Sequence, residues 1–228
     1  FNEEETILKT IDNCRLSFPS ADVLVVNDSS TDSTLEILAE SEINYLSLPI
    51  NLGVGGAMRA AFKYAHTNNY DYLVQVDADG QHNPAGIQVL LSQSDQFDIV
   101  IGSRFMSTES YKVQSVRKAA IIVIGGYLRI ITRTRLSDPT SGFRLSNHKA
   151  IELFSQTYPT EYLADTVGSI VLADMAGLRI GECPTKMNRR QGGKPSQNHL
   201  KSLMHLFRTL IAISMMKLGN PYHMKGKA

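Results

Sequence analysis

The chain has 228 residues, of which 43% are hydrophobic, and this length suits one large α/β domain or two small ones. Its 23 lysines and arginines nearly balance its 22 aspartates and glutamates, so the net charge of +1 excludes an overall attraction to polyanions such as nucleic acids. The two cysteines, Cys14 and Cys183, lack the spacing of a zinc site or a disulfide scaffold and suit a reducing cytosol.

The first half of the chain alternates predicted helices with predicted strands. Asn2 can cap a first helix, because apolar residues follow it at helical spacing. Short runs of valine, leucine and isoleucine then have the composition of buried parallel strands. These predicted strands cover residues 23–26, 43–48, 73–76 and 98–104, and predicted helices separate them. This alternation predicts an α/β fold with a mostly parallel sheet and helices on both faces.

The second half is less regular. The apolar run at residues 119–128 is too short to cross a bilayer, which takes about 20 residues, so it predicts a core helix or an interfacial one. Cations interrupt the apolar residues of the last predicted helix, which is therefore amphipathic. The predicted elements are a turn into a short strand at 138–144, a helix at 163–176, a strand at 179–183, a basic loop at 189–196 and the amphipathic helix at 199–218.

Two carboxylates follow the predicted strand at 73–76. In extended backbone Asp77 and Asp79 would point the same way, at the rim where open α/β sheets bind ligands. A Mg²⁺ or Mn²⁺ ion that takes one or two carboxylates plus diphosphate oxygens would fit there. An acidic turn is the simpler explanation of the same residues. A phosphatase nucleophile of the haloacid dehalogenase type also uses Asp-x-Asp, but it requires Thr or Val where this chain has Gln81.

Polar residues end the other predicted strands too. Because the carboxyl ends of parallel strands meet at one edge of a sheet, we expect these residues to converge with the two aspartates. They are Asp28, Asn51 and Arg104. Gly53 and Gly55 follow at the start of a helix, where glycines let the backbone approach a phosphate or let the helix pack tightly. The basic loop at 189–196 contains two glycines and three cations, which suits a lid over a diphosphate, although a solvated loop is the alternative.

Several motifs resemble family 2 glycosyltransferases with the GT-A fold. The start, Phe-Asn-Glu-Glu, resembles the end of P-x-Y/F-N-E-E, so the first strand of that fold would be missing from the chain. Residues 26–34 resemble V-D-D-G-S-x-D-x-T with Asn27 in place of the first Asp, and residues 51–57 resemble N-x-G-K-G-x-A with Val54 in place of Lys. The motifs at 77–82, 102–104 and 138–144 resemble those of polyprenyl-phosphate sugar transferases. The second half is more similar to bacterial cell-surface polysaccharide transferases.

The resemblance implies roles for individual residues. The metal ligands for Mg²⁺ or Mn²⁺ would be Asp77, Asp79 and Gln81. The nucleotide-sugar site would contain Glu3, Asp28, Asn51, Gly53, Asp77, Arg104, Arg189 and Lys194. The acceptor site would contain Arg117 and Arg144, and the catalytic residues would be Asp79, Asp165 and Arg190. The domain would cover residues 1–196, with a nucleotide-binding half at 1–104 and an acceptor half at 105–196, followed by a helix and tail at 197–228.

The resemblance also implies an inverting transfer from a UDP-, GDP- or dTDP-sugar to a lipid-linked acceptor. A lipid phosphate is already anionic and needs no general base, whereas a sugar hydroxyl must lose a proton. For a hydroxyl acceptor Asp165 would be the first candidate base and Glu161 the second, although Asp165 also suits the start of a helix as a simple N-terminal acid. The chain has no Trp, so it lacks the Q-x-x-R-W motif of the processive synthases.

Two readings from other classes compete with this one. A sugar nucleotidyltransferase needs a glycine-rich, arginine-containing loop after its first strand, and the opening Asn-Glu-Glu does not match it. A non-catalytic nucleotide-sugar-binding module would not need to keep Asp77, Asp79 and Gln81 together. The basic apolar run at 117–135 and the last helix predict a cytoplasmic protein that is peripheral on the inner face of the membrane. The alternative is that both helices pack on the sheet or join two copies of the chain.

Overall fold

The computed structural model describes residues 1–106, 115–132, 134–160, 164–188, 211 and 214. Its strands are β1 Leu24–Asn27, β2 Asn44–Ser47, β3 Tyr72–Gln75, β4 Ile99–Ser103, β5 Arg144–Asn147 and β6 Ile180–Pro184. Its helices are α1 Ile7–Ser17, α2 Thr34–Ala39, α3 Gly53–Thr67, α4 Ile87–Leu91, α5 Ser115–Ile131, α6 His148–Gln156 and α7 Ser169–Met175. A short 3₁₀ helix, η1 Pro84–Gly86, precedes α4, and a π-helical turn, η2 Ala164–Gly168, precedes α7.

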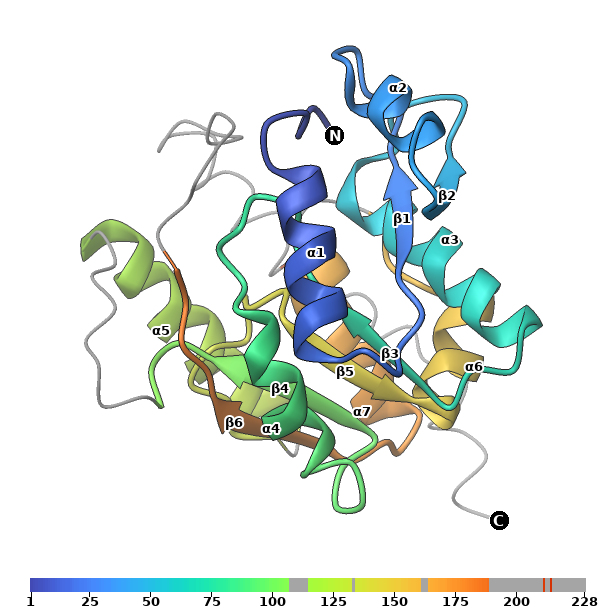
Figure 1. The fold of residues 1–228 in the computed structure, drawn as a ribbon. Coiled ribbons are helices and arrows are strands. Elements are labelled where there is room, and N and C mark those ends of the chain that lie inside the picture. Colours follow the sequence, from blue (N-terminus) through green and yellow to red (C-terminus); the bar gives the residue numbers. More distant parts are fainter. Residues whose placement is uncertain (107–114, 133, 161–163, 189–210, 212–213, 215–228) are drawn as a thin grey trace.

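The described strands form two sheets. β1 pairs in parallel with β2, and the larger sheet has the order β3-β5-β4-β6. β4 and β6 are parallel, whereas β5 is antiparallel to both β3 and β4, so β3, β4 and β6 all run the same way (Figure 1). The α/β prediction is confirmed. The strand order is new, because β5 inserts between two strands that are consecutive in the sequence-based scheme.

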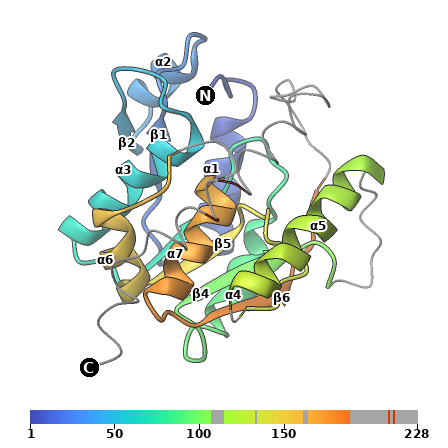
Figure 2. The same cartoon turned by 180° about the vertical axis from the view of Figure 1, so that it is seen from behind.

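Helices cover both faces of the larger sheet. Ile99 and Ile101 of β4 face the core formed with α3, α5, α6 and α7, while Val100 between them faces Leu90 of α4 and the buried Phe143. Figure 2 shows α5, α6 and α7 on the near face, with α1 and α4 behind the sheet. Alternating side chains of a strand thus contribute to two separate cores, which explains the continuous apolar runs in the sequence.

The apolar run at 119–128 lies within α5. One side of this helix is buried in the core through Ile121, Ile124 and Leu128, so the core-helix prediction is correct for that side. The opposite side exposes Ile122, Val123 and Ile130. No helix within the described ranges is both long and apolar enough to cross a membrane. Most of the predicted helix at 199–218 lies outside the described residues.

One predicted helix start is wrong, one helix was missed, and one predicted helix has an unexpected first turn. α1 begins at Ile7 rather than near Asn2, whose left-handed backbone (φ 57°) and amide side chain serve a contact with Thr31 instead of a helix cap. α6 was not predicted at all, although Asn147 caps it by accepting hydrogen bonds from the backbone of residues 149 and 150. The predicted helix at 163–176 begins, within the described residues, as a π-helical turn.

A buried carboxylate joins three strands at the end of the sheet where β4 begins. Asp98 accepts hydrogen bonds from the backbone and guanidinium of Arg179 and from the amide of Asn147. Burial alone would raise the pKa of Asp98, but the bonds from Arg179 and Asn147 lower it to about 2. A depressed pKa means that the carboxylate stabilises the fold above the ordinary Asp pKa and loses this effect as the pH falls toward about 2.

We therefore expect Asp98→Asn to destabilise the protein at pH 7 by about 1–2 kcal/mol, after allowing for solvent around the half-exposed Arg179. The difference from wild type should shrink between about pH 4 and pH 2, because protonation then removes the same charge from the native protein. Urea denaturation at pH 7 and at pH 3 measures both effects. Asp95→Asn, which changes an exposed carboxylate nearby, is the control. Equal stability of the two variants at pH 7 would contradict the assignment.

Candidate functional site

The two aspartates of the predicted metal site lie just after β3. The strand ends at Gln75, and residues 78–79 form a turn completed by Gly80 at φ 74°, so the extended backbone that we expected between the aspartates is absent. Asp77 is half-exposed and accepts a hydrogen bond of 3.2 Å from the Gln75 amide. Asp79 is buried and accepts a bond of 3.0 Å from the backbone N–H of Gln81. The turn, rather than the strand, sets the direction of the second carboxylate.

His82 contacts both the backbone and the carboxylate of Asp77. Its Nδ1 accepts a hydrogen bond of 2.9 Å from the backbone N–H of Asp77, and its Nε2 lies 3.6 Å from Asp77 Oδ2. The ring is buried and packs on Phe143 at 5.2 Å between centroids. No role was predicted for His82, although it lies in the motif at 77–82.

The chain segment after β6 runs beside the same turn. Asn188 donates its backbone N–H to Gln81 O at 2.8 Å and its amide to Gly80 O at 3.4 Å, and Met187 forms a β-bridge with His82. Asn188, the last described residue before the predicted lid, therefore lies beside the aspartate turn. The lid residues themselves, Arg189, Arg190 and Lys194, lie outside the described residues.

Asp28, which directly follows β1, lies against the start of α3. The carboxylate of Asp28 is buried, and its two oxygens accept bonds of 2.8 Å each from the backbone N–H groups of Leu52 and Gly53. Asn51 donates its amide to the carbonyl oxygen of Asp28 at 3.1 Å. The structure thus brings Asp28, Asn51 and Gly53 together at a helix N-terminus, where the helix dipole favours an anion. Gly53 has φ 74°, which explains the glycine.

The opening residues bind the loop between β1 and α2. Glu3 donates its backbone N–H to Thr34 Oγ1 at 3.0 Å, and its carboxylate accepts a bond of 2.9 Å from Thr6 Oγ1. Asn27, which replaces an aspartate of the family motif, is buried and bonded on both sides of its amide, to Ser47 and to the backbone of Ser30. This departure therefore leaves a satisfied side chain at the end of β1.

The second glycine of the α3 motif has a packing role. A Cβ built on Gly55 would lie 2.7 Å from Thr160 Cα and 2.8 Å from Pro159 O, so α3 and the segment before Asp165 are in direct backbone contact. This observation favours tight packing, one of the two explanations for these glycines.

We expect Gly55→Ala to destabilise the protein by about 1–3 kcal/mol, because backbone rather than a flexible side chain must move to admit the methyl group. Gly126→Ala is the matched control: it lies in α5 with nothing within 4 Å of the added carbon, and alanine should stabilise that helix by about 0.5–1 kcal/mol. Thermal denaturation of both variants measures the contrast. Equal melting temperatures would show that the contact yields without cost.

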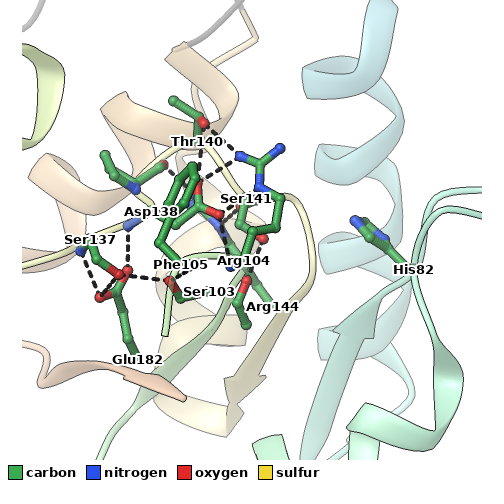
Figure 3. A network of polar contacts seen from close by, with 12 residues as sticks. His82, Ser103, Arg104, Phe105, Ser137, Asp138, Thr140, Ser141, Arg144 and Glu182 are labelled. Atoms are coloured by element: carbon green, nitrogen blue, oxygen red, sulfur yellow. Dashed lines mark hydrogen bonds and ion pairs between the residues drawn. The ribbon is translucent and has the colours of Figure 1, made fainter. Parts of the chain in front are cut away.

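A buried ion-pair network lies beyond the end of β4 (Figure 3). The guanidinium of Arg104 binds both carboxylate oxygens of Asp138 at 2.6 Å, and one of its nitrogens also reaches Thr140 Oγ1 at 3.0 Å. The backbone of Ser137 and Asp138 donates in turn to the carboxylate of Glu182 on β6, each bond being 2.7 Å. Burial raises the pKa of Glu182 above its ordinary value, and these bonds offset only part of that rise. Arg104 therefore reaches the rim as part of an ion pair, which sequence reasoning missed because Asp138 lies 34 residues away.

Asp165 lies in η2, close to the aspartate turn. Burial raises the pKa of its carboxyl group; the nearby Arg144 opposes this shift, and the negative charge of Asp77 adds to it. Tyr158, itself buried, donates its hydroxyl to the backbone carbonyl of Asp165 at 2.9 Å. Arg144 links η2 to the end of β3, because it donates to Thr166 O and pairs with Gln75 in the sheet, although 88 residues separate Asp165 from Asp77 in the sequence. The second candidate base, Glu161, lies outside the described residues.

One of the two arginines predicted for the acceptor site is buried and bonded to the protein itself. Arg144 at the start of β5 is buried, and its guanidinium donates to Pro139 O, Ser141 O, Thr166 O and Ser169 Oγ. Arg117 lies in α5, but its side chain is outside the described part of the chain.

Asp77, Asp79 and Gln81 would supply oxygen ligands from one short turn. Nowhere in the described ranges do three or more His, Cys, Asp or Glu side chains gather into a ready-made metal site. Two carboxylates and an amide fit Mg²⁺ or Mn²⁺ when a diphosphate and water complete the coordination shell. This donor set does not fit a structural zinc site, which requires four protein ligands.

The profile described as glycosyl transferase family 2 matches residues 1–154. The chain is 33% identical over 150 residues to an undecaprenyl-phosphate mannosyltransferase of Micrococcus luteus, and the match covers 63% of this chain and 62% of that protein. It is 25% identical over 213 residues to a UDP-N-acetylglucosamine–dolichyl-phosphate N-acetylglucosaminyltransferase of Methanococcus voltae, a match covering 82% of each chain. The chain thus spans less than two thirds of the Micrococcus protein.

Among solved structures, the fold is similar to glucosyl-3-phosphoglycerate synthase from Mycobacterium tuberculosis in complex with Mn²⁺ and UDP-glucose. The TM-score is 0.68 at 21% sequence identity, and the superposition covers 97% of this chain and 77% of that one. The likeness confirms the predicted GT-A fold.

Proposed function

The chain belongs to glycosyl transferase family 2, and we propose that it is a metal-dependent, inverting enzyme that transfers a sugar from a nucleotide-diphosphate sugar to a lipid-linked acceptor in cell-surface glycan synthesis. The observation that carries this proposal is the turn directly after β3, which holds the carboxylates of Asp77 and Asp79 two residues apart at the end of that strand. The match to the family includes the aspartate turn itself.

The donor would bind along the edge formed by α3 and the aspartate turn. Asp77, Asp79 and Gln81 would hold Mg²⁺ or Mn²⁺, which stabilises the departing diphosphate when bound. The amino end of α3, prepared by Asp28, Asn51 and Gly53, would receive the nucleotide part together with Glu3. Arg189, Arg190 and Lys194 would close over the diphosphate, because their loop starts at Asn188 beside Gln81. Arg117 would face the acceptor.

The relatives support the donor and the acceptor class. Two of them are named for undecaprenyl phosphate and dolichyl phosphate, which favours a polyprenyl-phosphate or other lipid-linked acceptor. The structural neighbour is bound to Mn²⁺ and UDP-glucose, which favours a divalent ion and a nucleotide-sugar donor, with UDP, GDP and dTDP as the candidate carriers. The exposed Ile122, Val123 and Ile130 of α5 would let a cytoplasmic enzyme meet such a lipid at the inner face of the membrane.

A second acceptor class is favoured by one observation. Asp165 is a carboxylate with a raised pKa on a turn that Arg144 links to the end of β3, and a raised pKa suits a general base that takes a proton from a sugar hydroxyl. In that case the acceptor would be a saccharide, free or lipid-linked, and Asp165 would act in each turnover.

A thermal-shift panel tests the proposed function. UDP-glucose, UDP-N-acetylglucosamine, GDP-mannose and dTDP-glucose are each added with and without MnCl₂. We expect one nucleotide class to raise the melting temperature, and to do so mainly with Mn²⁺, because a ligand that binds only the native state stabilises it by mass action. No Mn²⁺-dependent shift with any of the four donors would overturn the proposal.

A further inference from the structure

We propose that Arg144 is a positioning residue that holds the π-helical turn carrying Asp165 against the turn that packs on Asp77. The inference rests on the proposed function, and it differs from the acceptor-binding role that the family resemblance implies for Arg144. In this role the buried Arg144 would set the position of Asp165 relative to the carboxylates of Asp77 and Asp79.

The guanidinium of Arg144 is committed to the protein. It donates from Nε to Ser141 O at 2.6 Å and from one terminal nitrogen to Pro139 O at 2.7 Å. Its other terminal nitrogen donates to Thr166 O at 2.8 Å and to Ser169 Oγ at 3.0 Å. A guanidinium has five N–H donors, so these four bonds leave one. Bidentate recognition of a phosphate needs two, and only 7% of the residue is exposed.

Two of these four bonds, to Pro139 O and Ser141 O, fix the turn at 138–143, which lies beside Asp77. The turn at 138–143 is also tied to β4, because Ser141 donates its hydroxyl to Gly102 O at 2.7 Å. A Cβ built on Gly142 would lie 3.4 Å from Asp77 Oδ2 and 3.1 Å from the Gln75 amide nitrogen. The backbone of Gly142 therefore leaves only about the space of a methyl group beside the Asp77 carboxylate. A shift of this turn toward Asp77 would press on the carboxylate.

The other half of the bonds fixes the turn that carries Asp165. Thr166 O and Ser169 Oγ belong to the π-helical turn and to the first residue of α7, on either side of the point where the helix type changes. π-helical turns are rare and recur at functional sites. The carbonyl oxygen of Thr166 accepts hydrogen bonds from Arg144 and from the Ser169 hydroxyl, and that of Asp165 accepts one from the Tyr158 hydroxyl. Two buried side chains therefore stabilise a local geometry that α-helical bonding alone would not provide.

The test compares Arg144→Lys, Arg144→Met and the milder Tyr158→Phe with the matched control Arg179→Lys. Arg179 is another arginine with several hydrogen bonds, but it lies at the opposite end of β4 with Asp98. Two readouts are needed. Amide hydrogen exchange of residues 164–169 reports on the turn and requires no substrate. Steady-state kinetics with the donor that gives the largest thermal shift, and with undecaprenyl phosphate in detergent micelles, separate kcat from the acceptor KM.

If Arg144 is a positioning residue, exchange at 164–169 accelerates about tenfold or more in both Arg144 variants and about threefold to tenfold in Tyr158→Phe, but stays at the wild-type rate in Arg179→Lys. Lysine does not rescue, since a single ammonium cannot reach four acceptors in a fork. With undecaprenyl phosphate the kcat of Arg144→Lys falls about 10-fold to 100-fold at an unchanged acceptor KM, because the turn at 138–143 no longer holds Asp77 in place.

Unchanged exchange at 164–169 in all three variants overturns the inference, whatever the activity. It is overturned as well if Arg144→Lys keeps the wild-type kcat and raises only the acceptor KM, because lysine would then substitute for a phosphate-binding cation. A wild-type enzyme that shows no Mn²⁺-dependent donor binding overturns the proposed function instead. The exchange experiment then still decides whether Arg144 braces the turn.

Discussion

Replacing Asp79 with asparagine is expected to remove the Mn²⁺-dependent part of donor stabilisation and to lower transfer at least about 100-fold. Asparagine keeps an oxygen that can accept from the Gln81 backbone N–H, so the turn should retain its shape and the ligand-free protein should melt nearly as the wild type does. What is lost is the negative charge that a hard divalent ion requires. Asp79→Ala should show the same loss of Mn²⁺ dependence, with a further decrease in stability of about 1 kcal/mol.

The control is Asp71→Asn, which removes an exposed carboxylate just before β3, at the other end of that strand. It should leave both the melting temperature with donor and the rate unchanged. Titrating MnCl₂ against each variant at a saturating donor concentration separates metal binding from donor binding. If Asp79→Asn shows the same Mn²⁺-dependent shift as the wild type, the metal site is not at this turn.

Local sequence logic located the residues at strand ends. Asp28 and Asn51 follow predicted strands, and the structure brings them together because strands of an α/β fold deliver their carboxyl ends to one edge. The same reasoning located Asp77 and Asp79, but its geometric premise was wrong, since the strand ends at Gln75 and the chain already turns at Ala78 and Asp79. Gly80 completes this turn in the left-handed region.

Contacts between distant segments could not be read in the same way. The pairing of Arg104 with Asp138, and the four bonds of Arg144, depend on β5 entering the sheet between β3 and β4. Nothing in the periodicity of a four-residue strand specifies its neighbours. From the sequence both arginines were expected to bind a ligand, whereas in the fold both are buried and bonded to protein groups. This is why the resemblance to a family motif located the residues but not their environments.

The last expected result concerns the acceptor. Asp165→Asn should leave transfer to a lipid phosphate largely intact, because that acceptor is already ionised and no proton has to be removed. It should also stabilise the protein at pH 7 and above. The pKa of Asp165 is raised in the native state, so ionisation of this carboxyl opposes folding as the pH rises through that pKa, and asparagine removes the opposing charge. Denaturation of wild type and variant at pH 5 and pH 8 measures the gain without any substrate.

A hydroxyl acceptor predicts a different outcome for the same variant. Transfer would fall by about 100-fold to 10,000-fold while the Mn²⁺-dependent donor shift survives, since only the base is lost. In the wild type, kcat would then decline on the acid side at a pH above the ordinary range of an aspartate, because the raised pKa of Asp165 requires a higher pH to keep the base ionised. That acid limb would be absent from the residual activity of Asp165→Asn. An unchanged kcat and an unchanged pH profile would instead identify Asp165 as a bystander and leave the phosphate of the acceptor as the nucleophile.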